Sequence, residues 1–263
     1  MSLFRPAERA TKADAGSKPQ SALGETLRTF IYAVIIAFGV RSFGYEPFNI
    51  PSGSMIPTLL IGDYLFVSKF SYGYSRFTLA LGIPLFEGRI FGSLPQRGDV
   101  AVFKLPRDNK TDYIKRIVGL PGDRIQIIAG VLNINGTAAK LERVEDAIGV
   151  DHTGRQIKIA QFQETLPNGK VHRIYKERNS GPHNNTQVYV VPPRNYFMMG
   201  DNRDNSLDSR FPAEMRGVGF VPEENLVGRA EFIFFSLEEG TRFWEMWRWP
   251  FDVRLGRLLQ GVN

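Results

Sequence analysis

The sequence predicts a mostly β protein: an antiparallel β-sheet domain with a smaller β-rich inserted domain, preceded by one N-terminal transmembrane helix. Three observations support this fold class. An apolar run near the N-terminus is bracketed by arginines. From residue 48 onward, short segments rich in β-branched and aromatic residues alternate with Gly, Pro and Asp turns. Beyond the apolar run, no stretch keeps the 3.6-residue spacing of an amphipathic helix.

The composition limits what the protein can be. Of the 263 residues, 43% are hydrophobic and 12% aromatic, which is typical of a globular, β-rich chain. The chain has no cysteine, which excludes disulfides, thiol nucleophiles and cysteine metal sites. The formal charge is +6, but no basic block carries interleaved aromatics, so we expect no nucleic-acid partner.

The N-terminal region predicts a disordered cytoplasmic tail over 1–22 and a membrane helix over 23–45. The central run 29–40 would rise only about 18 Å, short of a hydrocarbon core of about 30 Å. A buried helix or a signal-peptide apolar region is therefore the alternative. We favour a span because Arg28 and Arg41 can snorkel to the interfaces. Basic residues are also more frequent before the run than just after it, which places the N-terminus in the cytoplasm.

The rest of the chain divides into a β domain and additions to it. The expected strands are 64–70, 99–105, 112–120, 124–128, 195–200 and 229–235. The predicted β domain covers 46–128 and 195–250, with an inserted β-rich subdomain over 129–194 and a C-terminal tail over 251–263. Asn135-Gly136 is a strong hairpin signal within the insertion.

Residues 71–96 hold many apolar side chains that look exposed. We expect this loop to face the membrane, resting on its outer leaflet with Trp244, Trp247 and Trp249. The alternative, that the loop packs on the β core, has equal weight from the sequence.

The segment Pro51–Asp63 holds a candidate nucleophile. Gly53 permits a sharp turn that presents Ser54 beside its own backbone N–H, an arrangement that suits a nucleophile with an oxyanion donor. From this segment alone, an ordinary Ser/Gly/Pro turn is the better explanation. Serine also needs a base. The histidines lie in the insertion without a tight motif, so a Ser-His-Asp triad has no support; they are His152, His172 and His183.

Lysine is the other base known for serine, and Lys115 is the candidate. In a strand, Lys115 and Arg116 point to opposite faces, and each has apolar neighbours. One cation can snorkel or pair, and the other is a candidate for burial. A free lysine has a pKa of about 10.4, so only about one in 2,500 is neutral at pH 7, and burial lowers that pKa. A surface lysine on an edge strand is the simpler alternative.

Residues 199–210 form a polar loop after a hydrophobic strand. A calcium loop beginning at Asp201 is excluded because the glycine and glutamate that it needs are missing. Alternating Asp and Arg instead predict a rigid ion-pair lattice, in which Ser206 is placed to bond a neighbouring lysine.

Four stretches together resemble bacterial type I signal peptidase (leader peptidase), a family of Ser/Lys-dyad serine proteases. They are 48–70, 97–104, 112–125 and 199–210, in this order. The resemblance implies that Ser54 is the nucleophile and Lys115 the general base. It also implies that Ser52 joins the Ser54 N–H in the oxyanion hole and that Ser206 orients the lysine.

The resemblance also implies supporting residues and a substrate, and it implies no metal and no cofactor. Structural ion pairs are expected at Arg116, Asp201, Asp208 and Arg210. Arg116 needs a carboxylate, and Asp208 is the first candidate. Pocket positions are expected at Phe48, Ile50, Met55, Leu59, Val102, Tyr113 and Ile114. An extended substrate with small residues at −3 and −1 (Ala-x-Ala) would add as a strand beside 112–117.

These expectations describe signal peptidase I, a serine endopeptidase acting on signal peptides of exported preproteins. Its place would be the bacterial inner membrane, single-pass, with the catalytic domain periplasmic and the lipid bilayer and secretion translocon as partners. The family's best-known member has two spans, whereas this chain offers one. Two alternatives remain. One is a Ser/Lys protease with one dedicated substrate, of the self-cleaving repressor or pilus or conjugation maturation type. The other is a non-catalytic export scaffold.

Overall fold

The computed structural model describes residues 22–78, 88–150, 155–176 and 183–263. The predicted tail therefore lies almost wholly outside the described residues. The chain divides into two units, residues 1–38 and residues 39–263.

Helix α1 (Ala22–Phe43) is the predicted N-terminal apolar helix. Within it, Gly24–Phe43 is long and apolar enough to cross a membrane, and it is the one such helix in the described ranges. Its 20 residues rise about 30 Å, the thickness of a hydrocarbon core. Almost all of its described side chains are exposed, so its apolar surface is not used to build a protein core.

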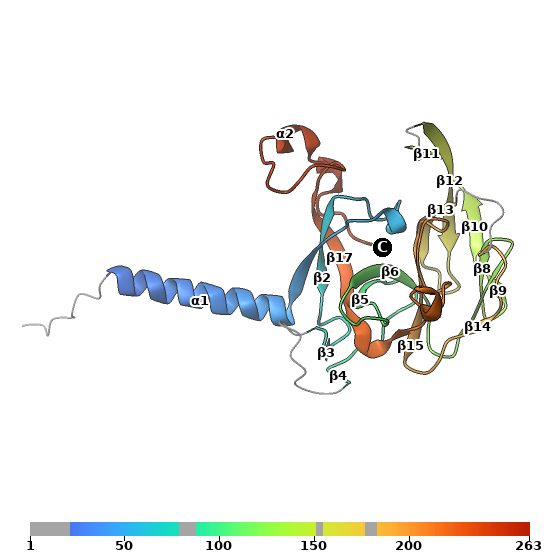
Figure 1. The fold of residues 1–263 in the computed structure, drawn as a ribbon, viewed down its shortest axis with the longest axis horizontal. Helices are drawn as coiled ribbons and strands as arrows, with labels where there is room; N and C mark the ends of the chain where they lie inside the picture. The colour runs from blue at the N-terminus through green and yellow to red at the C-terminus, as the bar shows by residue number, and fades with distance from the viewer. Residues whose placement is uncertain (1–21, 79–87, 151–154, 177–182) are drawn as a thin grey trace, which may run out of the picture. The chain divides into compact units, whose positions relative to one another are not determined.

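The second unit is built on a seven-stranded antiparallel sheet, which confirms the predicted fold class (Figure 1). The strand order is β1-β2-β17-β5-β6-β15-β16. The bounds are β1 (Tyr45–Asn49), β2 (Asp63–Ser68), β5 (Val100–Lys104), β6 (Asp112–Gly119), β15 (Asn195–Met199), β16 (Val221–Pro222) and β17 (Leu226–Ser236). Register shifts interrupt the pairing of β17 with β2 and with β5, and such irregularities increase the local bend and twist of a sheet.

Both faces of this sheet are buried in its centre. Along β5, Val102 belongs to one apolar cluster and its neighbour Phe103 to another, because successive side chains point to opposite faces. The first cluster also contains Met55, which follows the predicted nucleophile, and the second contains Ile117 of β6. The strand that carries Lys115 is therefore held by packing on both sides.

The inserted region forms two smaller sheets beside the main one (Figure 1). The first has the order β14-β7-β8-β9, with β7 (Arg124–Ile128), β8 (Val131–Ile134), β9 (Thr137–Ala138) and β14 (Tyr189–Val190). The second joins β10 (Lys140–Arg143), β11 (Ala147–Val150), β12 (Gln156–Thr165) and β13 (Val171–Lys176). Asn135 and Gly136 turn between β8 and β9 with φ of 55° and 81°, as a tight hairpin turn requires. β7, which we assigned to the main β domain, pairs with insertion strands.

The apolar loop 71–96 contains a short strand pair and mixes buried with exposed side chains. In the apolar loop, β3 (Tyr74–Ser75) pairs with β4 (Arg89–Ile90), and residues 79–87 lie outside the described residues. Tyr72 of this loop is buried in the core, whereas Phe91 and Leu94 are exposed. The described part of the loop therefore contains both packed and exposed apolar side chains.

The C-terminal segment packs against the sheet after the short helix α2 (Trp249–Asp252). The Leu259 N–H donates to the Ile233 carbonyl, and Val262 packs against the core. Arg257 forms an ion pair with the fully buried Asp63. The remaining short turns of 3₁₀-helix are η1 (Gly53–Met55), η3 (Ala213–Met215), η4 (Glu223–Asn225) and η5 (Leu255–Arg257).

Candidate active site

Ser54 lies in η1, the turn that leaves the end of β1, and its side chain is buried. The turn is fixed from the far side by Asn202. The Asn202 N–H donates to the Ser54 carbonyl at 3.1 Å, and its side-chain amide donates to the Gly53 carbonyl at 3.1 Å. The backbone on both sides of the hydroxyl is thus held by the polar loop 199–210.

Lys115 lies on β6, and its Nζ is 2.7 Å from Ser54 Oγ. The side chain is 3% exposed, and its Nζ also donates to the Ile114 carbonyl at 2.8 Å. Burial lowers the pKa of Lys115 to about 8, against the opposing effect of Asp208 and Asp201. At pH 7 roughly one such amine in ten is neutral, about 250 times the fraction for a free lysine. The pair therefore has the contact distance that a hydroxyl and its base need, and a usable fraction of the amine is neutral.

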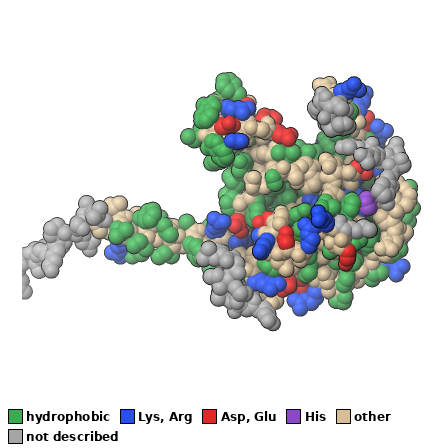
Figure 2. Space-filling view, in the orientation of Figure 1, with side chains coloured by type: hydrophobic (Ala, Val, Ile, Leu, Met, Phe, Trp, Pro, Cys, Tyr) green, Lys and Arg blue, Asp and Glu red, His purple; other side chains and the backbone are tan. Residues whose placement is uncertain are grey.

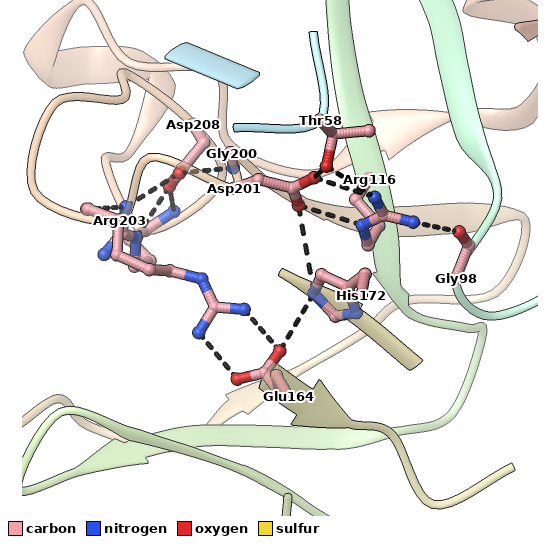
Figure 3. A network of polar contacts seen from close by, with 10 residues as sticks. Thr58, Gly98, Arg116, Glu164, His172, Gly200, Asp201, Arg203 and Asp208 are labelled. Carbon is pink, nitrogen blue, oxygen red and sulfur yellow. Dashed lines mark hydrogen bonds and ion pairs between the residues drawn. The ribbon is translucent and has the colours of Figure 1, made fainter. Parts of the chain in front are cut away.

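Arg116, the next residue, is fully buried on the opposite face and forms a two-point ion pair with Asp201 (Figure 3). Its Nε and Nη2 donate to the two Asp201 oxygens at 2.9 and 2.7 Å, and Nη1 donates to the Gly98 carbonyl at 2.7 Å. Our expectation that Asp208 is its first partner was wrong. In the antiparallel register Met199 lies opposite Arg116, so the carboxylate that follows Met199 most closely reaches the guanidinium.

Asp208 pairs instead with Arg210, at 2.8 Å, and accepts from the Gly200 N–H at 3.0 Å. Burial opposes ionisation of Asp208, but the Arg210 guanidinium outweighs it and lowers the pKa of this carboxyl. Gly200 has no room for a side chain: a Cβ there would lie 2.1 Å from Ser206 Oγ and 2.5 Å from the Ser54 carbonyl oxygen. The loop can therefore approach the nucleophile turn only because this position is glycine.

Ser52 and Ser206 both lie at the site. Ser52 Oγ is 3.4 Å from Ser54 Oγ, and the Ser54 N–H belongs to the first turn of η1, where N–H groups lack a partner within the helix. Ser206 is buried, but in the described ranges no hydrogen bond joins its hydroxyl to Lys115. The structure thus places Ser206 beside the site without the predicted contact to the lysine.

A cavity of about 440 Å³ opens onto Ser54 and Lys115. Five of the seven predicted pocket residues line it: Phe48, Ile50, Val102, Tyr113 and Ile114. The other two, Met55 and Leu59, do not line it, because both side chains are fully buried in the core beneath the turn. The lining residues that sequence reasoning missed are Asn49, Pro51, Thr111, Asp112, Asn205 and Leu207. All but Thr111 are immediate chain neighbours of predicted site residues, and that adjacency was the available signal.

The histidines take no part in this geometry in the described ranges. His172 is buried against Glu164, and the His183 ring contacts Phe211. His152 lies outside the described residues. Those residues also contain no His/Asp/Glu cluster with the geometry of a metal site.

Comparison with known proteins identifies relatives of the whole chain. The family described as "Signal peptidase, peptidase S26" matches residues 23–235. Signal peptidase I of Rickettsia typhi is 39% identical over 94% of this chain and 96% of its own length. Signal peptidase I of Rickettsia conorii is 41% identical over 89% of this chain and 91% of its own length.

A solved signal peptidase I from Enterococcus faecalis is also similar in sequence, with 26% identity over 52% of this chain and 97% of that one. Its TM-score is 0.31, too low to support a conclusion about the fold.

Proposed function

We propose a Ser54/Lys115 dyad as the catalytic centre of this chain, which belongs to the peptidase S26 family of signal peptidases. Signal peptidase I is a serine endopeptidase that removes signal peptides, so the open questions are which residues act, on which sequences and where. The observation that carries the proposal is the 2.7 Å contact between Lys115 Nζ and Ser54 Oγ in a site where the amine is buried.

In the proposed mechanism, the neutral amine of Lys115 takes the proton of Ser54 as Oγ attacks the carbonyl carbon of the scissile bond. The tetrahedral oxyanion accepts hydrogen bonds from the Ser54 N–H and the Ser52 hydroxyl. The resulting ammonium gives its proton to the leaving amine, and an acyl-enzyme forms on Ser54. Lys115, neutral again, then takes a proton from the water that releases the acyl group.

We propose that the substrate binds as a strand beside the first half of β6. Asp112–Lys115 pairs with β5 on one edge, whereas β15 pairs with β6 only from Arg116 onward. Within the part of the chain that the structure describes, no strand pairs with the other edge of Asp112–Lys115, so this edge can bond an extended peptide. The cavity beside this edge lies between β6 and β1, and its apolar walls suit small side chains at −3 and −1.

We propose that the protein is bound to the bacterial inner membrane by α1, with the N-terminus cytoplasmic and the catalytic unit outside. The apolar length of α1 and the basic residues before it support this arrangement. Exposed apolar side chains also gather around α2 (Figure 2). Trp244 is 66% exposed and Trp247 71% exposed, as expected of a surface that rests on lipid; Trp249 packs on Phe235 instead.

The test is cleavage of a purified preprotein that ends its signal peptide in Ala-x-Ala. We expect Ser54→Ala and Lys115→Ala to lower kcat/KM by at least about a hundredfold, since loss of a nucleophile or a general base costs this much or more. Lys140→Ala, on an exposed lysine of β10, is the matched control and should be fully active. Full activity of Lys115→Ala would rule out the dyad. Cleavage of a preprotein with Phe at −1 as fast as one with Ala would rule out the proposed specificity.

A further inference from the structure

The inserted strands reach the active site through Glu164, a carboxylate that the mechanism above does not use. Glu164 is the penultimate residue of β12 and is fully buried. Both of its oxygens accept from Arg203, one of them at 2.8 Å (Figure 3). Burial raises the pKa of Glu164, but Arg203 and His172 outweigh this effect and hold it well below the ordinary value. Glu164 and Arg203 are therefore a buried, fully charged pair.

Arg203 connects this pair to the catalytic turn. The Arg203 N–H donates to the Tyr175 carbonyl, and the Tyr175 N–H donates to the Asp201 carbonyl, each at 2.9 Å. Strand β13 thus holds residues 201–203 along their backbone. Asn202, in the middle of this stretch, holds Ser54 and Gly53. Residues 201–203 therefore connect the inserted strand β13 on one side to the turn that carries Ser54 on the other.

The buried charges around this segment balance. Three guanidinium groups face three carboxylates in the described network: Arg116, Arg203 and Arg210 against Asp201, Asp208 and Glu164. His172 lies between two of the carboxylates, with Nε2 3.2 Å from Glu164 and 3.8 Å from Asp201. Burial and Arg116 lower the pKa of His172. The six charged groups pair with one another, and Asp208 and Asp201 still raise the pKa of Lys115 against the effect of burial.

We propose that Glu164 and Arg203 are positioning residues of the active site, through which the inserted strands set the charge around Lys115. This inference rests on the proposed role of Lys115 as the base. Its physical reason is competition for the same two carboxylates. Asp201 and Asp208 favour the protonated form of Lys115, and Arg203 interacts with both of them as well as with Glu164.

The two substitutions, Glu164→Gln and Arg203→Gln, should shift the pKa of Lys115 in opposite directions. In Glu164→Gln, a buried negative charge is lost while Arg203 keeps its positive charge, so the surroundings favour the ammonium less and the pKa of Lys115 falls. In Arg203→Gln, a competing cation is lost, so the pKa of Lys115 rises. A purely structural role for the pair would lower the amount of folded enzyme without moving this pKa.

The experiment is the pH profile of kcat/KM for full-length enzyme in detergent, with a preprotein as substrate. We expect the acid limb to move down by about half a pH unit in Glu164→Gln and up by a similar amount in Arg203→Gln. At a fixed pH near 7, the resulting change of rate should appear in kcat rather than KM, since neither residue lines the cavity. The matched control is Glu142→Gln on the neighbouring strand β10, an exposed carboxylate whose loss should leave the limb in place.

The opposite signs keep the inference testable if one variant does not fold, because the remaining variant still has an assigned direction. The inference would be overturned if the acid limb of the kcat/KM profile stayed in place in a folded variant. It would also be overturned if this limb moved in the same direction in both variants. Full activity of Lys115→Ala in the same assay would show instead that the proposed function has failed.

Discussion

Lys115 combines two properties that oppose each other in a folded protein. It is a basic group, and it lies in a site that penalises its charge, because it is 3% exposed and its nearest oxygens belong to a hydroxyl and a carbonyl. The penalty makes a useful fraction of the amine neutral at physiological pH. The same penalty is a cost in folding stability, because the unfolded chain holds the ammonium in water.

This cost predicts that Lys115→Met makes the protein inactive and more stable. A methionine of similar length fills the space without a charge, so we expect about 2 kcal/mol of added stability at pH 7. The folded pKa of about 8 lies below that of the unfolded chain. The wild type is therefore penalised in full below pH 8, and the penalty disappears as the pH rises through the unfolded value of about 10.4.

Denaturant unfolding of the full-length proteins in detergent, at pH 7 and again near pH 10.5, measures this difference. The stability gap should narrow at the higher pH. A gap that is independent of pH, or a methionine variant that is less stable, would contradict the assignment of Lys115 as a desolvated amine.

At this scale the sequence predicted the pair but not its surroundings. Ser54 and Lys115 could be named because they lie in ordered motifs, and their contact distance agrees with that assignment. The partner of Arg116 could not, because Asp201 and Asp208 both follow its strand partner Met199 within nine residues, and only the structure decides between them. Glu164 could not be found at all, because it reaches the site from a strand that is close only in space.

Strand β6 has two halves with different partners, and this asymmetry places the substrate. Its second half pairs with β15 on one edge, and on the other edge Arg116 pairs with Val100 of β5 and Ile117 bonds Gly98 and Asp99, just before β5. Its first half has one free edge beside the cavity. The strand itself was predictable from its β-branched residues, but which edge stays free depends on pairing with β15, about 80 residues later in the chain, which local patterns do not encode.

The free edge predicts an alternating effect of backbone methylation in the substrate. In an antiparallel pair, every second residue exchanges hydrogen bonds with the partner strand. N-methylation at successive positions from −4 to −1 should therefore raise KM strongly at alternate positions and weakly at those between. A scan of peptide substrates measures KM for each. A uniform effect across the positions would contradict binding as an added strand.

The molecule as a whole separates an apolar helix from a catalytic β unit. The seven-stranded sheet and the inserted sheets belong to one compact unit, residues 39–263, although their strands alternate along the sequence. The sequence predicted the β class and the apolar helix. It did not predict that β7 joins the insertion or that 253–263 packs along β17, since both depend on pairing between distant segments.

The proposed topology predicts which side of the membrane each part faces. The chain has no cysteine, so single cysteines report without background. Thr137→Cys, in the exposed hairpin of the insertion, should react with a membrane-impermeant maleimide on intact spheroplasts. Ser17→Cys, before the helix, should react only after the membrane is permeabilised. The reverse pattern would contradict the proposed orientation.

The central claim, that Lys115 is a neutral amine serving Ser54, is tested most directly by the pH dependence of kcat/KM on a preprotein. The account predicts that kcat/KM rises with pH and levels off through a single ionisation near pH 8, the pKa that burial gives to Lys115. A profile that is flat between pH 6 and pH 9, or an ionisation near 10.4 as in a free lysine, would contradict it.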